Sequence, residues 1–219
     1  MLRSDTTAGR CTTPDDRRQA LSVLNATYAQ EKQWVDDAEA MFPEDDLSND
    51  AITWVVATVD EAPAGVLRIH YDPPLHLYDA YGLEPMEAAQ DLDIDAFIRS
   101  NQIAEIGRFA VLPAYRRRIR VVFWLMRMAS LDTLQRGYTH YVTDVFEDEP
   151  HSPYNFHTRV LGFQPVAHHA AGEMNCLHRR ITLMLNLKDA YQRLRESKNR
   201  LYRFLTDGWD DAVMRQLSV

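Results

Sequence analysis

The sequence predicts an α/β fold, because segments that favour strands and segments that favour helices alternate along its 219 residues. Three observations support this prediction. Residues 51–71 have the composition of two strands joined by a turn, being rich in Ile, Val, Thr and Trp. Residues 105–127 combine a strand, a turn and the start of a helix, and residues 188–205 have the apolar spacing of an amphipathic helix.

The stretch from Glu105 to Arg127 is the most informative part of the chain. A mostly apolar strand ends at Pro113, and apolar residues then recur at helical spacing from Val121. Four arginines stand at the junction, namely Arg116, Arg117, Arg118 and Arg120. A helix N-terminus attracts anions, whereas cations there oppose the helix dipole unless an anion relieves them. The junction therefore predicts a binding site for phosphate groups.

This stretch resembles the acyl-CoA-binding segment of the GNAT N-acyltransferases, whose pattern is Arg/Gln-x-x-Gly-x-Gly/Ala. Arg116 matches the first position, while Ile119 and Val121 replace both glycines. The autoinducer (acyl-homoserine-lactone) synthases and the long-chain N-acyl amino acid synthases also lack these glycines. Their Glu-x-x-Arg-Phe/Leu-x-Val pattern on the preceding strand is matched here by Glu105, Arg108, Phe109 and Val111. The sequence thus resembles this branch of the superfamily most.

The resemblance covers roughly residues 50–185 and implies a GNAT-like fold. We expect a mixed, mostly antiparallel sheet with helices on both faces and a splayed pair of strands that forms the cofactor cleft. Residues 13–186 would form this domain, after a flexible segment at 1–12. Residues 187–219 would add a C-terminal amphipathic helix that covers the sheet edge, forms a homodimer or presents a basic face to a partner. Burial of its apolar stripe on its own domain is the favoured interpretation.

The resemblance also implies the donor, which would be an acyl-CoA or the acyl-phosphopantetheine of an acyl carrier protein. The residues expected to bind it are Phe109, Val111, Arg116, Arg117, Arg118 and Arg120. No metal is required, because acyl transfer from a thioester needs a base, donors for the carbonyl oxygen and a proton for the leaving thiolate. The histidines at 168, 169 and 178 have no Cys or carboxylate at metal-site spacing.

Glu105 is the predicted general base, since its strand should pass the thioester. The alternative is a purely structural carboxylate paired with Arg108 or Arg68. Residues three apart on a strand point to opposite faces, so Arg68 on the neighbouring strand is the favoured partner. Arg108 is expected either to bind the carboxylate of the acceptor or to order an acidic loop.

Further candidates lie on either side of this strand. Arg68 belongs to a Gly-x-x-Arg motif of the autoinducer branch and follows an acidic loop at 42–50. Asp45, Asp46 and Asp50 could contact the acceptor amine, although acidic runs of this kind are more often solvated loops. Tyr154 and Asn155 begin a predicted short helix before Leu-Gly-Phe, where GNAT proteins carry an Asn and often a Tyr. The spacing does not identify the general acid, because His157 and Thr158 also lie there.

The remaining elements complete the expected order. Thr13 should cap a helix that ends near residue 34. Strands are expected at 51–59 and 66–71, separated by a turn at 60–65, and again at 140–146, 164–168 and 176–187. Residues 72–100 form a long connection with one or two short helices between 84 and 100, which is either part of the substrate pocket or a packing elaboration.

Composition and charge exclude several classes of function. The formal net charge of −8 argues against general nucleic-acid binding. Two cysteines far apart favour a reduced, cytoplasmic setting, and we find no candidate membrane segment. The sequence therefore predicts an N-acyltransferase that acts on an amino-acid-like small-molecule amine. The alternatives are an acetyl-CoA-dependent N-acetyltransferase of a small amine or protein, and a non-catalytic GNAT-like module that binds acyl-CoA or a metabolite.

Overall fold

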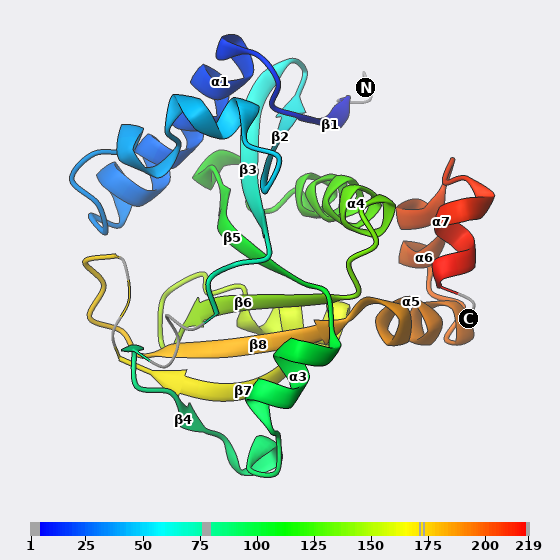
Figure 1. The fold of residues 1–219 in the computed structure, drawn as a ribbon. Helices are drawn as coiled ribbons and strands as arrows, with labels where there is room; N and C mark the ends of the chain where they lie inside the picture. Colours follow the sequence, from blue (N-terminus) through cyan, green and yellow to red (C-terminus); the bar gives the residue numbers. More distant parts are fainter. Residues whose placement is uncertain (1–4, 76–79, 171, 173, 218–219) are drawn as a thin grey trace.

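The computed structural model describes residues 5–75, 80–170, 172 and 174–217. Its centre is one mixed sheet of eight strands in the order β1-β2-β3-β5-β6-β8-β7-β4 (Figure 1). All neighbouring strands pair antiparallel except β5 and β6. The strands are β1 (Thr6–Arg10), β2 (Ile52–Val59), β3 (Ala62–Tyr71), β4 (Glu84–Pro85), β5 (Ile103–Val111), β6 (His140–Phe146), β7 (Gln164–His169) and β8 (Arg180–Asn186).

Helices cover both faces of this sheet, as expected for the GNAT-like fold. The α-helices are α1 (Pro14–Leu24), α3 (Ile94–Ser100), α4 (Ile119–Gln135), α5 (Leu187–Glu196), α6 (Arg200–Thr206) and α7 (Asp211–Gln216). Shorter turns are the π-helices η1 (Asn25–Glu31) and η6 (Phe156–Leu161) and the 3-10 helices η2 (Glu39–Met41), η3 (Glu44–Ser48), η4 (Glu87–Ala89) and η5 (Pro113–Tyr115). Figure 1 shows α1 and α4 on opposite sides of β2, β3 and β5.

Two apolar clusters hold these layers together. Val121 and Leu125 of α4 are buried with Leu67 and Ile69 of β3 in the larger cluster, which continues into the C-terminal helices. The smaller cluster packs α1 on the other face, where the rings of Phe42 and Trp54 stack 4.1 Å apart. Alternate residues of β2 and β3 thus face different helices, because side chains of a strand alternate between the faces of its sheet.

The sheet splits open between β5 and β6. These strands pair in parallel over only three residues, Ile103–Glu105 on β5 and His140–Val142 on β6. Beyond Glu105, β5 keeps its pairing with β3, while β6 keeps its pairing with β8. The two strands therefore diverge, which gives the splayed pair that the resemblance implied.

A β-bulge follows directly on β5. Arg68 pairs with Gly107 and Val66 with Ala110, so β5 carries one residue more than β3 between these pairs. Arg108 sits there with a positive φ of 51°. Such a bulge changes the direction in which side chains point and interrupts the ladder of backbone hydrogen bonds.

Several expected boundaries are wrong at the N-terminal side. Residues 6–10, expected to be flexible, form the edge strand β1 against β2. Strand β3 begins at Ala62 rather than at residue 66, because Asp60 and Glu61 form a two-residue turn with φ of 50° and 68°. A turn was predicted here, but over six residues, 60–65. Its short form was missed because two-residue turns with positive φ angles usually contain Gly or Asn. The helix predicted from Thr13 is confirmed, with a capping box between Thr13 and Asp16, and it continues as η1.

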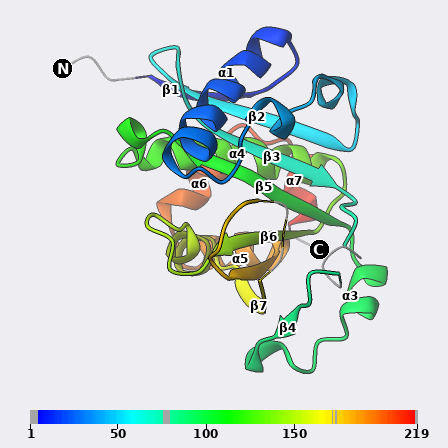
Figure 2. The same ribbon diagram turned by 90° about the vertical axis from the view of Figure 1, so that its left-hand side faces the viewer.

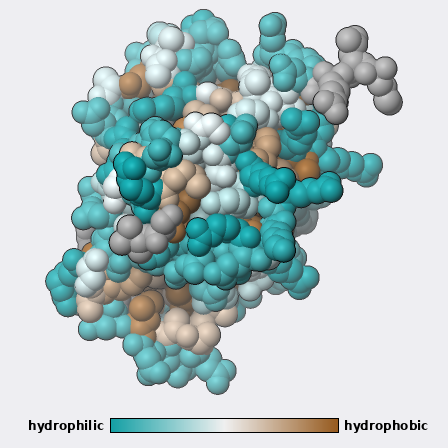
Figure 3. Space-filling view, turned by 90° about the vertical axis from the view of Figure 1, so that its right-hand side faces the viewer, coloured by the Kyte–Doolittle hydropathy of each residue, from teal (hydrophilic) through white to brown (hydrophobic). Residues whose placement is uncertain are grey.

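The C-terminal extension is three helices instead of one. The chain breaks after α5 at Lys198, where φ is 52°, and Asn199 then caps α6 through a bond from the Leu201 N–H. The predicted apolar stripe is nevertheless buried on the domain itself, at Leu187, Tyr191, Leu194, Leu201 and Leu205. The face that carries these helices is mostly hydrophilic, with only small apolar areas (Figure 3).

The connection between β3 and β5 packs at the far end of the sheet from α1. It contains β4, which pairs with β7, followed by η4 and α3 (Figure 2). Residues 76–79 of this connection lie outside the described part. Strand β8 starts at Arg180, four residues later than expected, because residues 174–179 form a loop. Within the described residues, no helix combines the length and the apolar character needed to cross a bilayer.

Two glycines allow a test of how the end of η6 is fixed. Gly162 and Gly137 have φ of 87° and 82°, but a Cβ at Gly162 would lie 1.5 Å from Nη2 of Arg193, whereas a Cβ at Gly137 meets nothing within 4 Å. We expect Gly137→Ala to cost about 1–2 kcal/mol of unfolding free energy through φ alone. Gly162→Ala should cost clearly more, because it also displaces the bond from Arg193 to the Leu161 carbonyl. Equal losses in urea unfolding would contradict this assignment.

His157 of η6 predicts how stability depends on pH. Burial lowers its pKa from 6.5 to about 4, and the bond between Nδ1 and the Pro153 carbonyl only partly opposes this. The folded state therefore favours the neutral ring, so its stabilisation is complete above pH 6.5 and is lost as the pH falls towards 4. We expect His157→Gln to flatten the plot of unfolding free energy against pH by up to about 1.4 kcal/mol per pH unit in this window. Above pH 7.5 both proteins should have the same slope.

Candidate active site

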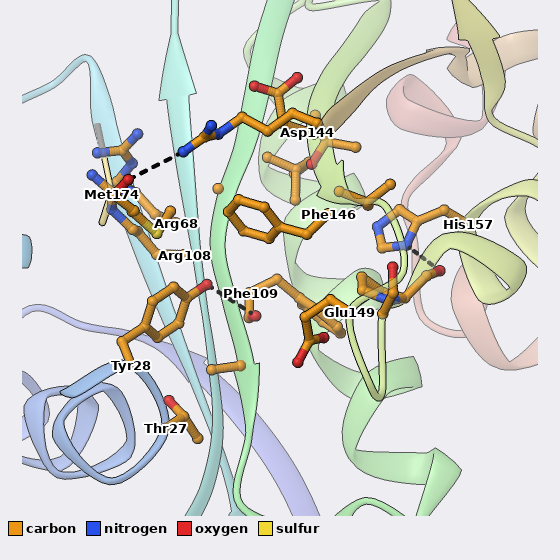
Figure 4. Close-up of a pocket in the computed structure, with 18 of the residues that line it drawn as sticks. Thr27, Tyr28, Arg68, Arg108, Phe109, Asp144, Phe146, Glu149, His157 and Met174 are labelled. Atoms are coloured by element: carbon orange, nitrogen blue, oxygen red, sulfur yellow. Dashed lines mark hydrogen bonds between the residues drawn. The ribbon is translucent and has the colours of Figure 1, made fainter. Parts of the chain in front are cut away.

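A cavity of about 530 Å³ fills the opening between the diverging strands. Its walls include every residue of β5 from Glu105 to Val111 and four residues of β6, Thr143–Phe146. One side is closed by the starts of α4 and η6, the other by η1 and the loop around Met174. Figure 4 shows Tyr28 and His157 on opposite sides of β5. The cavity therefore passes through the splayed sheet from one face to the other.

Glu105 lies where this opening begins, since it is the last residue of β5 that pairs with β6. Its Oε1 accepts a hydrogen bond of 3.1 Å from Nη2 of Arg68, and both side chains are mostly buried. The expected pairing of Glu105 with Arg68 is thus confirmed. Arg68 thus holds the Glu105 carboxylate in place at the opening, and a carboxylate can serve as a general base.

Arg108 lines the same cavity as Glu105, although strict alternation would place residues three apart on opposite faces. The bulge explains the difference, because the extra residue interrupts the alternation at this position. Gly107 directly before Arg108 was the available signal, because an isolated glycine within a strand often marks a bulge. Both predicted residues of the Glu-x-x-Arg motif consequently face one space.

The side closed by η1 has an aromatic wall that the sequence interpretation missed. Trp34 lies 4.3 Å from Phe146 and 5.6 Å from Tyr28, measured between ring centroids. Burial raises the pKa of Tyr28 to about 12, so its hydroxyl stays protonated and donates to the Phe109 carbonyl at 3.3 Å. Lys32 forms an ion pair with Glu149 across this wall. Tyr28 and Trp34, near the end of the first predicted helix, are the sequence feature from which this wall could have been predicted.

The arginine cluster divides into one anchored residue and three exposed ones. Arg116 lines the cavity, donates from Nη1 and Nη2 to the carboxylate of Glu31 at 2.7 and 2.5 Å, and contacts the Val111 carbonyl at 3.2 Å. This bidentate bond holds the pKa of Glu31 below its ordinary value. The other three, Arg117, Arg118 and Arg120, are exposed beside Ile119, which lines the cavity and is itself 47% exposed.

Besides the three exposed arginines, five predicted residues do not line the cavity. The acidic loop forms η3 against β2, where Asp46 accepts a bond of 2.8 Å from Nε1 of Trp54. Asp45 and Asp50 are likewise absent from the walls, as are Tyr154 and Asn155 at the start of η6. The residues of η6 that line the cavity are Phe156 and His157. The Nδ1 of His157 lies 2.9 Å from the Pro153 carbonyl, so the neutral ring presents Nε2 as an acceptor.

The cavity has no arrangement typical of a metal centre. Among the described residues, no three His, Cys, Asp or Glu side chains are grouped closely enough to hold a metal ion. Both cysteines are buried and free. The chemistry available here is therefore that of carboxylates, guanidinium groups and backbone N–H groups at the bulge.

Known proteins share both this fold and this sequence pattern. The family model of the N-acyl amino acid synthase FeeM matches residues 19–177. The structure of FeeM, an N-acyl amino acid synthase from uncultured soil microbes, aligns with a TM-score of 0.66 and 16% identity over 90% of this chain and 98% of that chain. No curated protein sequence matches the chain.

Two acetyltransferase structures also align. The ribosomal-protein-S18-alanine N-acetyltransferase from Escherichia coli gives a TM-score of 0.55 at 12% identity over 84% of this chain and 94% of that one. Aminoglycoside 6'-N-acetyltransferase complexed with coenzyme A gives 0.53 at 12% identity, over 84% and 97%. Structural matches at such low identity show only the fold, which is the GNAT fold. The family model shows the family, because it covers well over half of the chain. The chain therefore belongs to the family of the N-acyl amino acid synthase FeeM and is an acyltransferase that transfers acyl groups to nitrogen.

Proposed function

We propose that the protein transfers an acyl chain from an acyl carrier protein or CoA thioester to the amine of an amino-acid-like molecule in the cytoplasm. The observation that supports this most is the position of Glu105. Its carboxylate lies at the opening of the sheet, in a cavity that leads from the arginine-rich start of α4 to the aromatic wall on the opposite face. Donor and acceptor can thus approach Glu105 from opposite sides.

The donor would lie along β5 beyond Glu105. This part of β5 has no partner strand on the side of β6, so its backbone groups can pair with the amides of a phosphopantetheine arm. Phe109 and Val111 belong to this segment, and Arg116 lies where the arm would leave the cavity. Because Ile119 and Val121 replace the glycines, the phosphates would be held by guanidinium groups more than by close backbone approach.

The reaction would proceed by direct attack. Glu105, directly or through one water, accepts a proton from the amine, whose nitrogen then attacks the thioester carbonyl carbon. The negative charge on the carbonyl oxygen would be stabilised by N–H groups at the bulge and by the nearby Arg108. The C–S bond breaks, and the thiolate takes up a proton. We assign this last proton to no side chain, since neither Tyr154 nor Asn155 lines the cavity.

The three exposed arginines suggest how a carrier protein would be recognised. Arg117, Arg118 and Arg120 are exposed at the start of α4, next to Arg116 and Ile119 of the cavity wall, and they lie on an otherwise acidic chain. Such a patch complements an acidic protein surface more than a small molecule. We therefore propose that these residues contact the carrier protein, while Arg116 contacts the prosthetic arm.

Replacement of the proposed base tests the mechanism. Glu105→Gln should lower kcat/KM for acyl transfer by about 100-fold or more, because the neutral amide cannot accept the proton. Donor binding, measured by calorimetry, should remain within about threefold, since the shape of the side chain is kept. Asp45→Asn and Asp50→Asn are matched controls outside the cavity and should retain activity. Full activity of Glu105→Gln on every amine tested would refute the assignment.

Replacement of the exposed arginines tests the donor. Arg117→Gln, Arg118→Gln and Arg120→Gln combined should raise KM for an acyl carrier protein donor by about 10-fold and reduce its salt dependence. The same protein should use an acyl-pantetheine thioester almost normally. Arg116→Gln should impair both donors. Arg195→Gln, Arg200→Gln and Arg203→Gln combined, on the C-terminal helices, provide a control of equal charge. An effect there instead would place the carrier protein on those helices. Preference for acetyl-CoA in all assays would favour the acetyltransferase alternative.

A further inference from the structure

Arg180 is a buried cation on the wall of the cavity. It lies on β8, is only 4% exposed and lines the cavity beside Phe146, whose ring is 5.0 Å from its Cζ. Its Nη1 and Nη2 donate to the carbonyls of Ala170 and Met174 at 2.8 and 3.3 Å. These two bonds use two of the five N–H groups of the guanidinium. The remaining N–H groups can bind an anion that enters the cavity, because a guanidinium matches a carboxylate in shape and charge.

Asp144 lies beside Arg180 on the same face of the sheet, because Asp144 pairs with Thr182 and Phe146 pairs with Arg180. Its Oδ1 accepts a bond of 2.8 Å from the Thr182 hydroxyl, and its Oδ2 lies 3.1 Å from Nε2 of the fully buried His169. The side chain is 25% exposed, and it lines the cavity. A carboxylate can accept about four hydrogen bonds, so part of its capacity remains directed into the cavity.

The other cavity carboxylates differ from Asp144 in their partners. Glu105 faces Arg68, and Glu149 forms an ion pair with Lys32. Asp144 is held by a hydroxyl and an imidazole, and it forms no ion pair with Arg180 although both belong to neighbouring strands. The wall thus presents one negative and one positive group that do not neutralise each other, which suits a ligand that carries both charges.

Glu105, Asp144 and Arg180 follow one another outward from the start of the opening. Val142, Asp144 and Phe146 point to one face of β6, because side chains alternate along a strand. Val142 pairs with Glu105 at the start of the opening, Asp144 comes next, and Phe146 is paired with Arg180 farther out. We propose that Arg180 binds the carboxylate of an amino acid acceptor and that Asp144 orients its amine towards Glu105. This inference rests on the proposed function and assigns to Arg180 and Asp144 the selection of acceptors that carry both a free carboxylate and a free amine.

Acceptors that differ only in the carboxylate test this inference. Leucine and phenylalanine should each be compared with their primary amides, using one acyl donor and the full-length protein. We expect the wild type to prefer the acids, and Arg180→Gln to raise KM for the acids by about 10- to 100-fold while leaving KM for the amides nearly unchanged. kcat for the acids should change less than KM. Asp144→Asn should raise KM for acids and amides alike.

A second variant guards against a simple folding defect, since Arg180 also holds the loop that carries Ala170 and Met174. A Cβ at Gly172 would lie 2.6 to 2.9 Å from three guanidinium atoms of Arg180, so Gly172→Ala must displace this group while the charge stays. Gly172→Ala should therefore reduce the preference for acids over amides, as Arg180→Gln does. Arg108→Gln is the matched comparison, because Arg108 is the other candidate for the carboxylate.

Each outcome has a defined meaning. The inference would be overturned if the ratio of KM for acids to KM for amides stayed unchanged in both Arg180→Gln and Gly172→Ala. It would also be overturned if Arg108→Gln alone abolished the preference for acids. A wild type that acylates amides as well as acids would overturn it while leaving the proposed function intact. A wild type that acylates neither kind of amine would refute the proposed function itself.

Discussion

The structure depends on the early end of the pairing between β5 and β6. Parallel pairing stops at Glu105 and Val142, and each strand then stays with its other neighbour. Backbone groups that would normally be satisfied by a neighbouring strand are left facing the opening, which is costly unless water or a ligand replaces that strand. The bulge at Arg108 belongs to the same arrangement, because it redirects β5 just where the opening begins. The cavity is therefore a consequence of how the sheet is paired, and every proposed catalytic group is placed relative to it.

Charge within the cavity is organised in pairs. Glu105 is matched by Arg68, Glu149 by Lys32, and Glu31 by Arg116, so three carboxylates lie beside fixed cations. Asp144 and Arg180 are the exception, since the carboxylate is held by His169 and Thr182 and the guanidinium by two carbonyls. Ion pairs with Arg or Lys preserve the shape of the walls, whereas Asp144 and Arg180, which do not pair with each other, can each attract the opposite charge of a ligand. This contrast distinguishes the framework of the site from its proposed acceptor contacts.

The missing glycines at 119 and 121 have a clear structural meaning. Val121 is fully buried and packs against β3 within the larger core, while Ile119 is exposed at the cavity. A chain with side chains at both positions cannot offer the close backbone approach that glycine permits. The same segment instead places Ile119 and Arg116 in the cavity wall, with three exposed arginines beside them in the sequence. The start of α4 thus suits an elongated, partly apolar donor arm held by side chains.

The sequence by itself determined the order of the main elements, because periodicity is a property of neighbouring residues, and its resemblance to GNAT proteins implied the fold. It favoured Arg68 as a partner of Glu105, which the structure then confirmed. It also identified Arg116 and the strand before it. Only the tertiary structure decided that Arg108 shares a face with Glu105, that Tyr28, Trp34, Asp144 and Arg180 line the same cavity, and that Asp45, Asp46, Asp50, Tyr154 and Asn155 do not. The physical reason is that a bulge, a positive φ or a splayed pair of strands is a relation between distant segments. Such relations arise from packing and pairing, and spacing along one chain does not specify them.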